Sequence, residues 1–61
     1  GMTVGQYVTA IKMEEAKRLM DITPKSILEI ADYLGYSSQS HFQRVFKKML
    51  GMTPGEYRRR E

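Results

Sequence analysis

The 61-residue sequence contains no cysteine, no tryptophan and only one histidine. Without cysteine the chain forms no disulfide and offers no thiolate to a metal, and one histidine does not make a zinc site. We therefore expect no metal and no cofactor. No apolar run approaches the roughly 20 residues of a membrane span, and no signal-peptide pattern is present. The predicted location is the cytoplasm, with no membrane contact.

The chain also lacks the side-chain groupings on which enzymes depend. No nucleophile–base pair, carboxylate pair or phosphate-cradling glycine loop is visible. We therefore predict that the protein is not an enzyme. Chains of this length bury only about 60% of their unfolded surface, so the sequence forms one small domain at most, or a piece of a larger one.

Acidic and basic residues are distributed unevenly along the chain. Residues 1–37 carry four basic and five acidic side chains, whereas residues 38–61 carry six basic and two acidic ones. The net charge of +3 therefore combines −1 in the first part with +4 in the second. Cations collected in one half suit a partner that carries phosphates. A solubilising surface is the alternative explanation.

Cap residues predict where the helices begin, and no strand pattern is present. Three capping boxes, each a Ser or Thr followed three residues later by Glu or Gln, predict helix starts at Thr3, Ser26 and Thr53. A further helix is capped by Ser37 or Ser38. We expect helices to end before Pro24 and at Gly35 and Gly51.

These boundaries predict an all-α fold in one partial domain, residues 1–61. A long linker helix occupies residues 1–21, a helix-turn-helix residues 26–50, and a short C-terminal helix residues 53–60. Residues 1–7 (GMTVGQY) also resemble residues 51–57 (GMTPGEY), with five of seven positions identical. The likeness suggests that a second copy of the unit precedes this one in a longer protein. Chance similarity of two capping boxes is the alternative.

The first helix has two apolar faces, rotated by about a third of a turn at 100° per residue. The first comprises Val4, Tyr7, Val8 and Ile11, and the second Ala16, Leu19 and Met20. Two faces indicate packing against two bodies, whereas one irregular stripe is the alternative. If nothing covers the first face, we expect it to drive self-association.

Two amphipathic segments form the predicted helix-turn-helix. In the first, one face comprises Ile27, Ile30, Ala31 and Leu34. In the second, Phe42, Val45, Phe46 and Met49 recur at the spacing of a buried stripe. With that stripe turned inward, Ser40, Arg44 and Lys47 point away from the core. A helix presented in this way can enter the major groove of DNA.

The polar residues of this region suit contacts to bases and phosphates. Arg can bind guanine O6 and N7 together, and Gln can bind adenine N6 and N7 together. The predicted base contacts are Gln39, Ser40, Gln43 and Arg44. The predicted phosphate contacts, which position the protein without specifying sequence, are Lys25, Ser26, His41, Lys47, Lys48 and Arg58. Each assignment has an alternative explanation. The polar side chains of the second helix could form a solvated face, residues 58–60 could be a frayed terminus, and the His41 ring could pack at the core edge.

The sequence resembles the C-terminal DNA-binding region of the AraC/XylS family of bacterial transcription regulators. The segments that carry the resemblance are ILEIADYLGYS (27–37), QSHFQRVFKK (39–48) and GMTPGEYR (51–58), with KMEEAKRLM (12–20) similar to the family's linker helix. Val4 and Lys12 depart from the Pro and Arg that are common in the family.

The resemblance implies a domain of two helix-turn-helix units, of which this chain would hold the linker helix and the second. By position, Gln39, Ser40 and Arg44 match the family's base-reading sites. The missing first unit, the effector-binding region and the dimerisation region would lie elsewhere in the parent protein. The parent protein is expected to act at the bacterial nucleoid. The partner implied is double-stranded DNA. The rival interpretation is a protein-interaction module whose basic face docks RNA polymerase or another partner.

Overall fold

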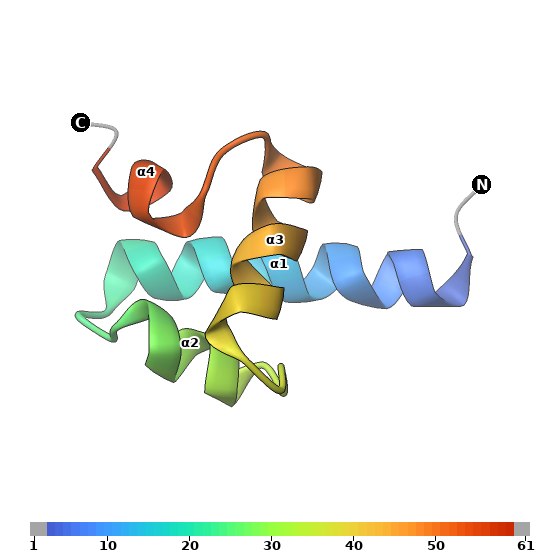
Figure 1. Ribbon diagram of the computed structural model, residues 1–61, viewed down its shortest axis with the longest axis horizontal. Coiled ribbons are helices and arrows are strands. Elements are labelled where there is room, and N and C mark those ends of the chain that lie inside the picture. The colour runs from blue at the N-terminus through green and yellow to red at the C-terminus, as the bar shows by residue number, and fades with distance from the viewer. Residues whose placement is uncertain (1–2, 60–61) are drawn as a thin grey trace.

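The computed structural model describes residues 3–59, which form four α-helices joined by short connections. The helices are α1 (Val4–Ile22), α2 (Ile27–Tyr33), α3 (Gln39–Leu50) and α4 (Pro54–Arg58). Figure 1 shows α1 along the length of the molecule with α3 crossing it, while α2 and α4 lie on opposite sides of α1 in this view. The fold is all-α, with the long first helix and short last helix predicted from the sequence.

Polar side chains at the helix starts satisfy N–H groups that would otherwise have no partner. At Ser26 the hydroxyl accepts from the Glu29 N–H at 3.1 Å, and the Glu29 carboxylate accepts from the Ser26 N–H at 2.8 Å. Reciprocal bonds of the same kind occur at the starts of α1 and α4. Ser38 caps α3 through the His41 N–H at 3.1 Å. The caps matter most for α2 and α4, which have 7 and 5 residues and are too short to persist alone.

The capping carboxylates are expected to make the protein less stable in acid. Backbone N–H groups of Ser26 and Thr53 hold the pKa values of Glu29 and Glu56 below their usual range. A carboxyl whose folded pKa is depressed stabilises the fold above its unfolded pKa and loses that contribution as the pH falls through its folded pKa. We expect the free energy of unfolding, measured with urea, to fall between about pH 5 and pH 3.

A Glu29→Gln, Glu56→Gln double variant tests the assignment, since glutamine keeps the capping acceptor without the titrating group. Its stability should depend less steeply on pH over that interval than the stability of the unchanged protein. Identical pH profiles for the two proteins would show that the capping carboxylates do not cause the acid sensitivity.

Two glycines with positive φ mark helix ends: Gly35 follows α2, and Gly51 is the C-cap of α3. Gly35 has φ 87° and Gly51 has φ 82°, a region that side chains with a Cβ rarely occupy. After α2 the Tyr36 N–H donates to the Ala31 carbonyl at 3.0 Å, and the Gly35 N–H donates to Asp32 at 3.1 Å. The chain therefore turns sharply from α2 into α3, as the sequence predicts.

The core lies where α1, α2 and α3 meet. Its buried side chains are Met13, Ala16, Leu19 and Met20 of α1, Ile30 and Ala31 of α2, and Phe42 and Phe46 of α3. Aromatic rings extend through it in sequence, from Tyr36 to Phe42, Phe46 and Tyr57, with neighbouring centroids 5.4 to 5.8 Å apart. Burial of one such side chain stabilises the fold by roughly 1.5–3 kcal/mol. This core fixes which side of α3 faces outward.

One prediction about the core was wrong. Met49 is 43% exposed, although its spacing places it on the buried stripe of α3. Met49 lines a groove between α3 and the N-terminal part of α1, so α1 does not cover it. Val45 is half-buried, and Leu50 packs against the core instead of Met49.

The two faces of α1 differ in burial as the sequence predicts. Ala16, Leu19 and Met20 are buried, whereas Val4, Tyr7, Val8 and Ile11 are 81%, 59%, 43% and 51% exposed. Figure 1 shows the N-terminal half of α1 extending beyond α2 and α4. Within residues 3–59, therefore, the first apolar face of α1 is left open to solvent. Gly1 and Met2, with which the internal likeness begins, lie outside the described residues.

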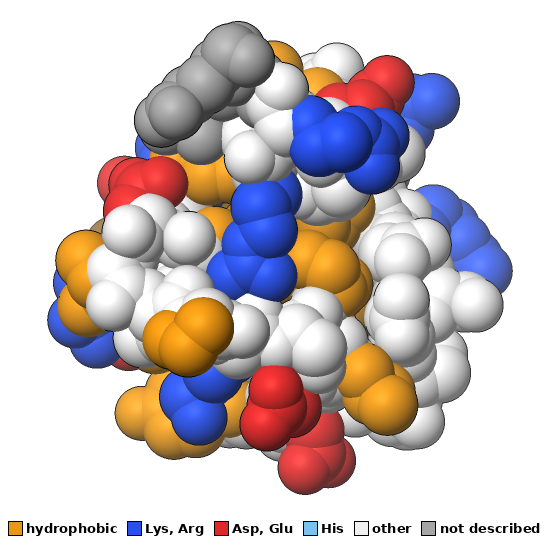
Figure 2. Space-filling model, turned by 90° about the vertical axis from the view of Figure 1, so that its left-hand side faces the viewer, with side chains coloured by type: hydrophobic (Ala, Val, Ile, Leu, Met, Phe, Trp, Pro, Cys, Tyr) orange, Lys and Arg blue, Asp and Glu red, His pale blue; other side chains and the backbone are white. Residues whose placement is uncertain are grey.

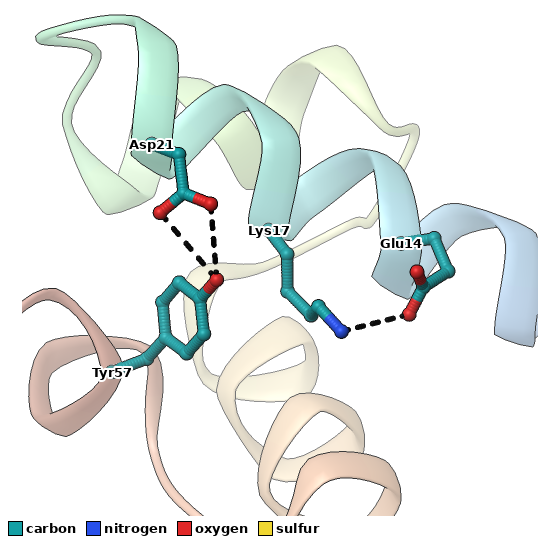
Figure 3. Close-up of polar contacts among 4 residues, drawn as sticks. All are labelled: Glu14, Lys17, Asp21 and Tyr57. Carbon is teal, nitrogen blue, oxygen red and sulfur yellow. Dashed lines mark hydrogen bonds and ion pairs between the residues drawn. The ribbon is translucent and has the colours of Figure 1, made fainter.

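Helix α4 is held against the C-terminal end of α1 by polar contacts. The Tyr57 hydroxyl lies 3.2 and 3.4 Å from the two carboxylate oxygens of Asp21, as Figure 3 shows. The neighbouring Lys17 forms an ion pair with Glu14 at 3.0 Å. Arg58 donates from its guanidinium to the carbonyls of Lys25 at 2.6 Å and Thr23 at 3.4 Å. The contacts of Tyr57 and Arg58 fix α4 and the connection between α1 and α2 in one position, whereas the Lys17–Glu14 pair lies within α1.

Candidate nucleic-acid interface

The outward face of α3 is polar and basic. Ser40, Arg44, Lys47 and Lys48 are exposed, while Phe42 and Phe46 on the opposite side are fully buried. The two phenylalanines lock the rotation of the helix, because turning Arg44 inward would bring both rings into water. Arg44 thus projects away from the rest of the chain, as the sequence predicts.

Two predicted base-contact residues lie at the edge of this face. Gln39 and Gln43 are half-buried. Gln39 stands in the first turn of α3, the part of a recognition helix that contacts base edges in helix-turn-helix proteins. Ser40 and Arg44 are therefore the more exposed of the four residues, and the two glutamines flank them on the side nearer the core.

His41 both packs and remains accessible. Its ring meets the Tyr36 ring edge-on, with centroids 5.3 Å apart and planes at 85°, yet the residue is exposed. The sequence left open whether His41 packs at the core edge or reaches outward. The contact with Tyr36 orients the imidazole on the flank of α3 that faces α1.

No acidic residue lies on α3 itself, although Glu56 at the start of α4 interacts electrostatically with Lys47. The sequence contains no Asp or Glu between Asp32 and Glu56, a stretch that includes all of α3. Acidic and basic side chains are interspersed instead at the end of the molecule that Figure 2 shows, which is the end where α4 and the C-terminus of α1 lie. The positive potential of α3 is therefore not neutralised within its own helix, an arrangement that favours polyanionic partners.

The remaining predicted phosphate contacts lie at the start of α2 and on α4. Lys25 is half-buried, and the Ser26 hydroxyl and N–H are both engaged by Glu29, whose carboxylate lies at the same helix end. The Arg58 guanidinium donates to two backbone carbonyls. Arg58 thus has a structural role that sequence reasoning missed. No local pattern reveals this role, because the carbonyls belong to Lys25 and Thr23, which lie more than thirty positions earlier in the chain.

Neither a metal site nor a membrane span is found in the part of the chain that the structure describes. Residues 3–59 contain no group of three or more His, Cys, Asp or Glu side chains that could hold a metal ion. None of the four helices described is both long enough and apolar enough to cross a bilayer.

A family model described as a helix-turn-helix domain matches residues 1–60. The chain belongs to the AraC/XylS family of transcription regulators. Relatives in this family include the melibiose operon regulatory protein of Escherichia coli and the F1 operon positive regulatory protein of Yersinia pestis, each 41% identical over 58 residues. A third, the probable transcription factor PqrA of Proteus vulgaris, is also 41% identical over 58 residues.

The match covers nearly all of this chain and only part of each AraC/XylS relative. It includes 95% of the chain in all three comparisons, but 19% of the melibiose and F1 regulators and 48% of PqrA. No solved structure matches the chain. The relatives are named as transcription regulators, so DNA-binding regulation is the function that family membership supports.

Proposed function

We propose that the protein binds double-stranded DNA in a sequence-specific manner, with α3 in the major groove, as part of a bacterial transcription regulator. The observation that carries the proposal is the exposed polar face of α3, fixed opposite two fully buried phenylalanines. An α-helix with its side chains is about 10–12 Å across, which suits a major groove about 12 Å wide. The proposed site of action is the nucleoid in the cytoplasm.

In this arrangement Arg44 and Ser40 meet base edges, and Gln39 and Gln43 reach bases from the edge of the helix. Arg44 has the planar donor pair that binds guanine O6 and N7 together. Lys47, Lys48 and His41 meet phosphates beside the groove, where they position the protein without reading sequence. Lys25, Ser26 and Arg58 are proposed as further contacts to DNA phosphates.

The experiment that tests this function is selection of duplexes from a random-sequence pool, followed by anisotropy titration of the selected duplex. We expect one enriched motif bound with a micromolar or weaker dissociation constant near physiological salt, because one module neutralises few phosphates. The logarithm of the binding constant should fall linearly with the logarithm of salt concentration, by about 0.9 for each phosphate neutralised. Nanomolar binding at about 150 mM salt would contradict the expectation of weak binding, whereas no enrichment at all would contradict the proposed function.

The rival function, docking of RNA polymerase or another protein partner by the same basic face, predicts a different result. DNA binding would then be independent of sequence. Substitution of Arg44 would leave the DNA footprint unchanged and would remove the contact with the protein partner. An activator can carry both functions on this face. In that case single substitutions remove the DNA contact or the protein contact separately, and both are lost together only when α3 unfolds.

We also propose that the exposed apolar face of α1 supports self-association. Val4, Tyr7, Val8 and Ile11 are between 43% and 81% exposed, and contiguous apolar patches of this kind mark interaction surfaces. We expect sedimentation velocity to show a concentration-dependent increase in mass, which a Val8→Lys, Ile11→Lys variant abolishes without loss of helicity. A strict monomer at high concentration would count against this proposal.

A further inference from the structure

A groove of about 550 Å³ separates the N-terminal half of α1 from α3. Its walls include Thr9 and Lys12 of α1, Tyr36 of the turn, and His41 and Lys48 of α3. Figure 1 shows that α3 crosses α1 and leaves this half of α1 extending past it. The groove therefore borders the outward face of α3 on one flank.

Neither wall of the groove carries an acidic side chain. Residues 3–13 and residues 33–55 contain no Asp or Glu, and every acidic residue of the sequence lies within residues 14–32 or at positions 56 and 61. The groove lining, by contrast, includes the cations Lys12 and Lys48 together with the His41 ring. Charge complementarity therefore favours an anionic occupant.

Lys12 is held in a defined position at the junction of α1 and α3. Its ammonium lies 5.3 Å from the centre of the Tyr36 ring, within the range of a cation–π contact. Tyr36 is fixed in turn by ring contacts with His41 and Phe42. A cation–π contact does not consume the three N–H donors of an ammonium, so Lys12 keeps donors for an anion in the groove.

We propose that this groove receives the sugar–phosphate backbone along one side of the major groove, with Lys12 as a phosphate contact contributed by α1. The inference rests on the proposed function. A helix nearly as wide as the major groove brings both of its flanks against the phosphate walls. His41 and Lys48 lie on the flank of α3 that faces α1, so the backbone on that side passes along the groove.

The apolar part of the lining suits the same occupant. Val45 and the 43% exposed Met49 line the groove beside the cations. The carbon-rich faces of deoxyribose rings can cover these side chains while the phosphates meet Lys12 and Lys48. The interface thereby extends from α3 to a helix that carries no predicted base contact.

The test is a comparison of Lys12→Gln with Lys17→Gln in DNA titrations at several salt concentrations. Both changes remove one positive charge from α1, but Lys17 pairs with Glu14 and lies outside the groove. We expect Lys12→Gln to weaken binding by a similar factor for all duplex sequences and to lower the salt slope by about 1. Lys12→Arg should restore both quantities, and Lys17→Gln should change the slope much less.

Equal effects of the two lysine variants on DNA binding would overturn the inference, as would DNA binding that Lys12→Gln leaves unchanged. If Lys12→Gln loses helicity, Thr9→Glu replaces it, since a carboxylate on the same wall should weaken DNA binding. Arg44→Ala separates the two proposals. If Arg44→Ala weakens DNA binding and Lys12→Gln does not, only the groove assignment fails. If both variants leave DNA binding unchanged, the DNA-binding function itself is contradicted.

Discussion

Replacement of Phe42 by alanine is expected to reduce the free energy of unfolding by about 3–5 kcal/mol. The Phe42 side chain is fully buried and its ring packs against Tyr36 and Phe46, with centroids 5.4 and 5.8 Å away. At roughly 0.05–0.15 kcal/mol per residue, a chain of this size has a total stability of about 3–9 kcal/mol. The variant should therefore be largely unfolded, which urea titration followed by circular dichroism will measure.

Tyr33→Ala is the matched control, because Tyr33 is aromatic but 65% exposed at the end of α2. Surface substitutions of this kind usually change stability by less than about 0.5 kcal/mol. A loss for Phe42→Ala no larger than the small loss expected for Tyr33→Ala would mean that burial of Phe42 does not stabilise the fold as stated.

Arg44→Ala is expected to weaken binding to the selected duplex by about 1–3 kcal/mol. Its guanidinium is exposed on the outward face of α3, and the substitution leaves both buried phenylalanines in place. The fold should therefore survive while discrimination at one base pair is lost. Anisotropy titrations with the selected duplex and with duplexes altered at single base pairs will measure both effects.

Lys47→Ala provides the comparison for a phosphate contact on the same helix. We expect it to weaken binding to all duplexes by a similar factor and to lower the salt slope by about 1, without altering the preferred sequence. Arg44→Ala with unchanged sequence preference would favour the protein-docking interpretation over base reading.

The helix starts were predictable because capping depends on residues three positions apart. Thr3, Ser26 and Thr53 each make both bonds of a capping box. The positive φ of Gly35 followed from the same local reasoning, since glycine is the residue that adopts this conformation without steric cost. Local chemistry thus fixed the elements and, through the spacing of Phe42 and Phe46, the orientation of α3.

Contacts between distant segments were not predictable from local patterns. Met49 was expected in the core, but whether a stripe position is covered depends on how the neighbouring helix packs, and Met49 lines an open groove beside α1. The bonds from Arg58 to the carbonyls of Thr23 and Lys25 require knowledge of where α4 docks. The placement of Lys12 over Tyr36 depends likewise on how α1 and the turn pack.

The most direct test of the account is DNA cleavage from a tag attached to α3. Because the chain contains no cysteine, Ser40→Cys creates a single attachment point for a DNA-cutting iron chelate on the exposed face, and Asp32→Cys provides the control on α2. With the tag at position 40, we predict cleavage confined to a few base pairs within the selected motif, with the pattern of a major-groove reagent, and little cutting from position 32. Equal cutting from both positions, or cleavage from position 32 alone, would contradict the proposal that α3 enters the duplex.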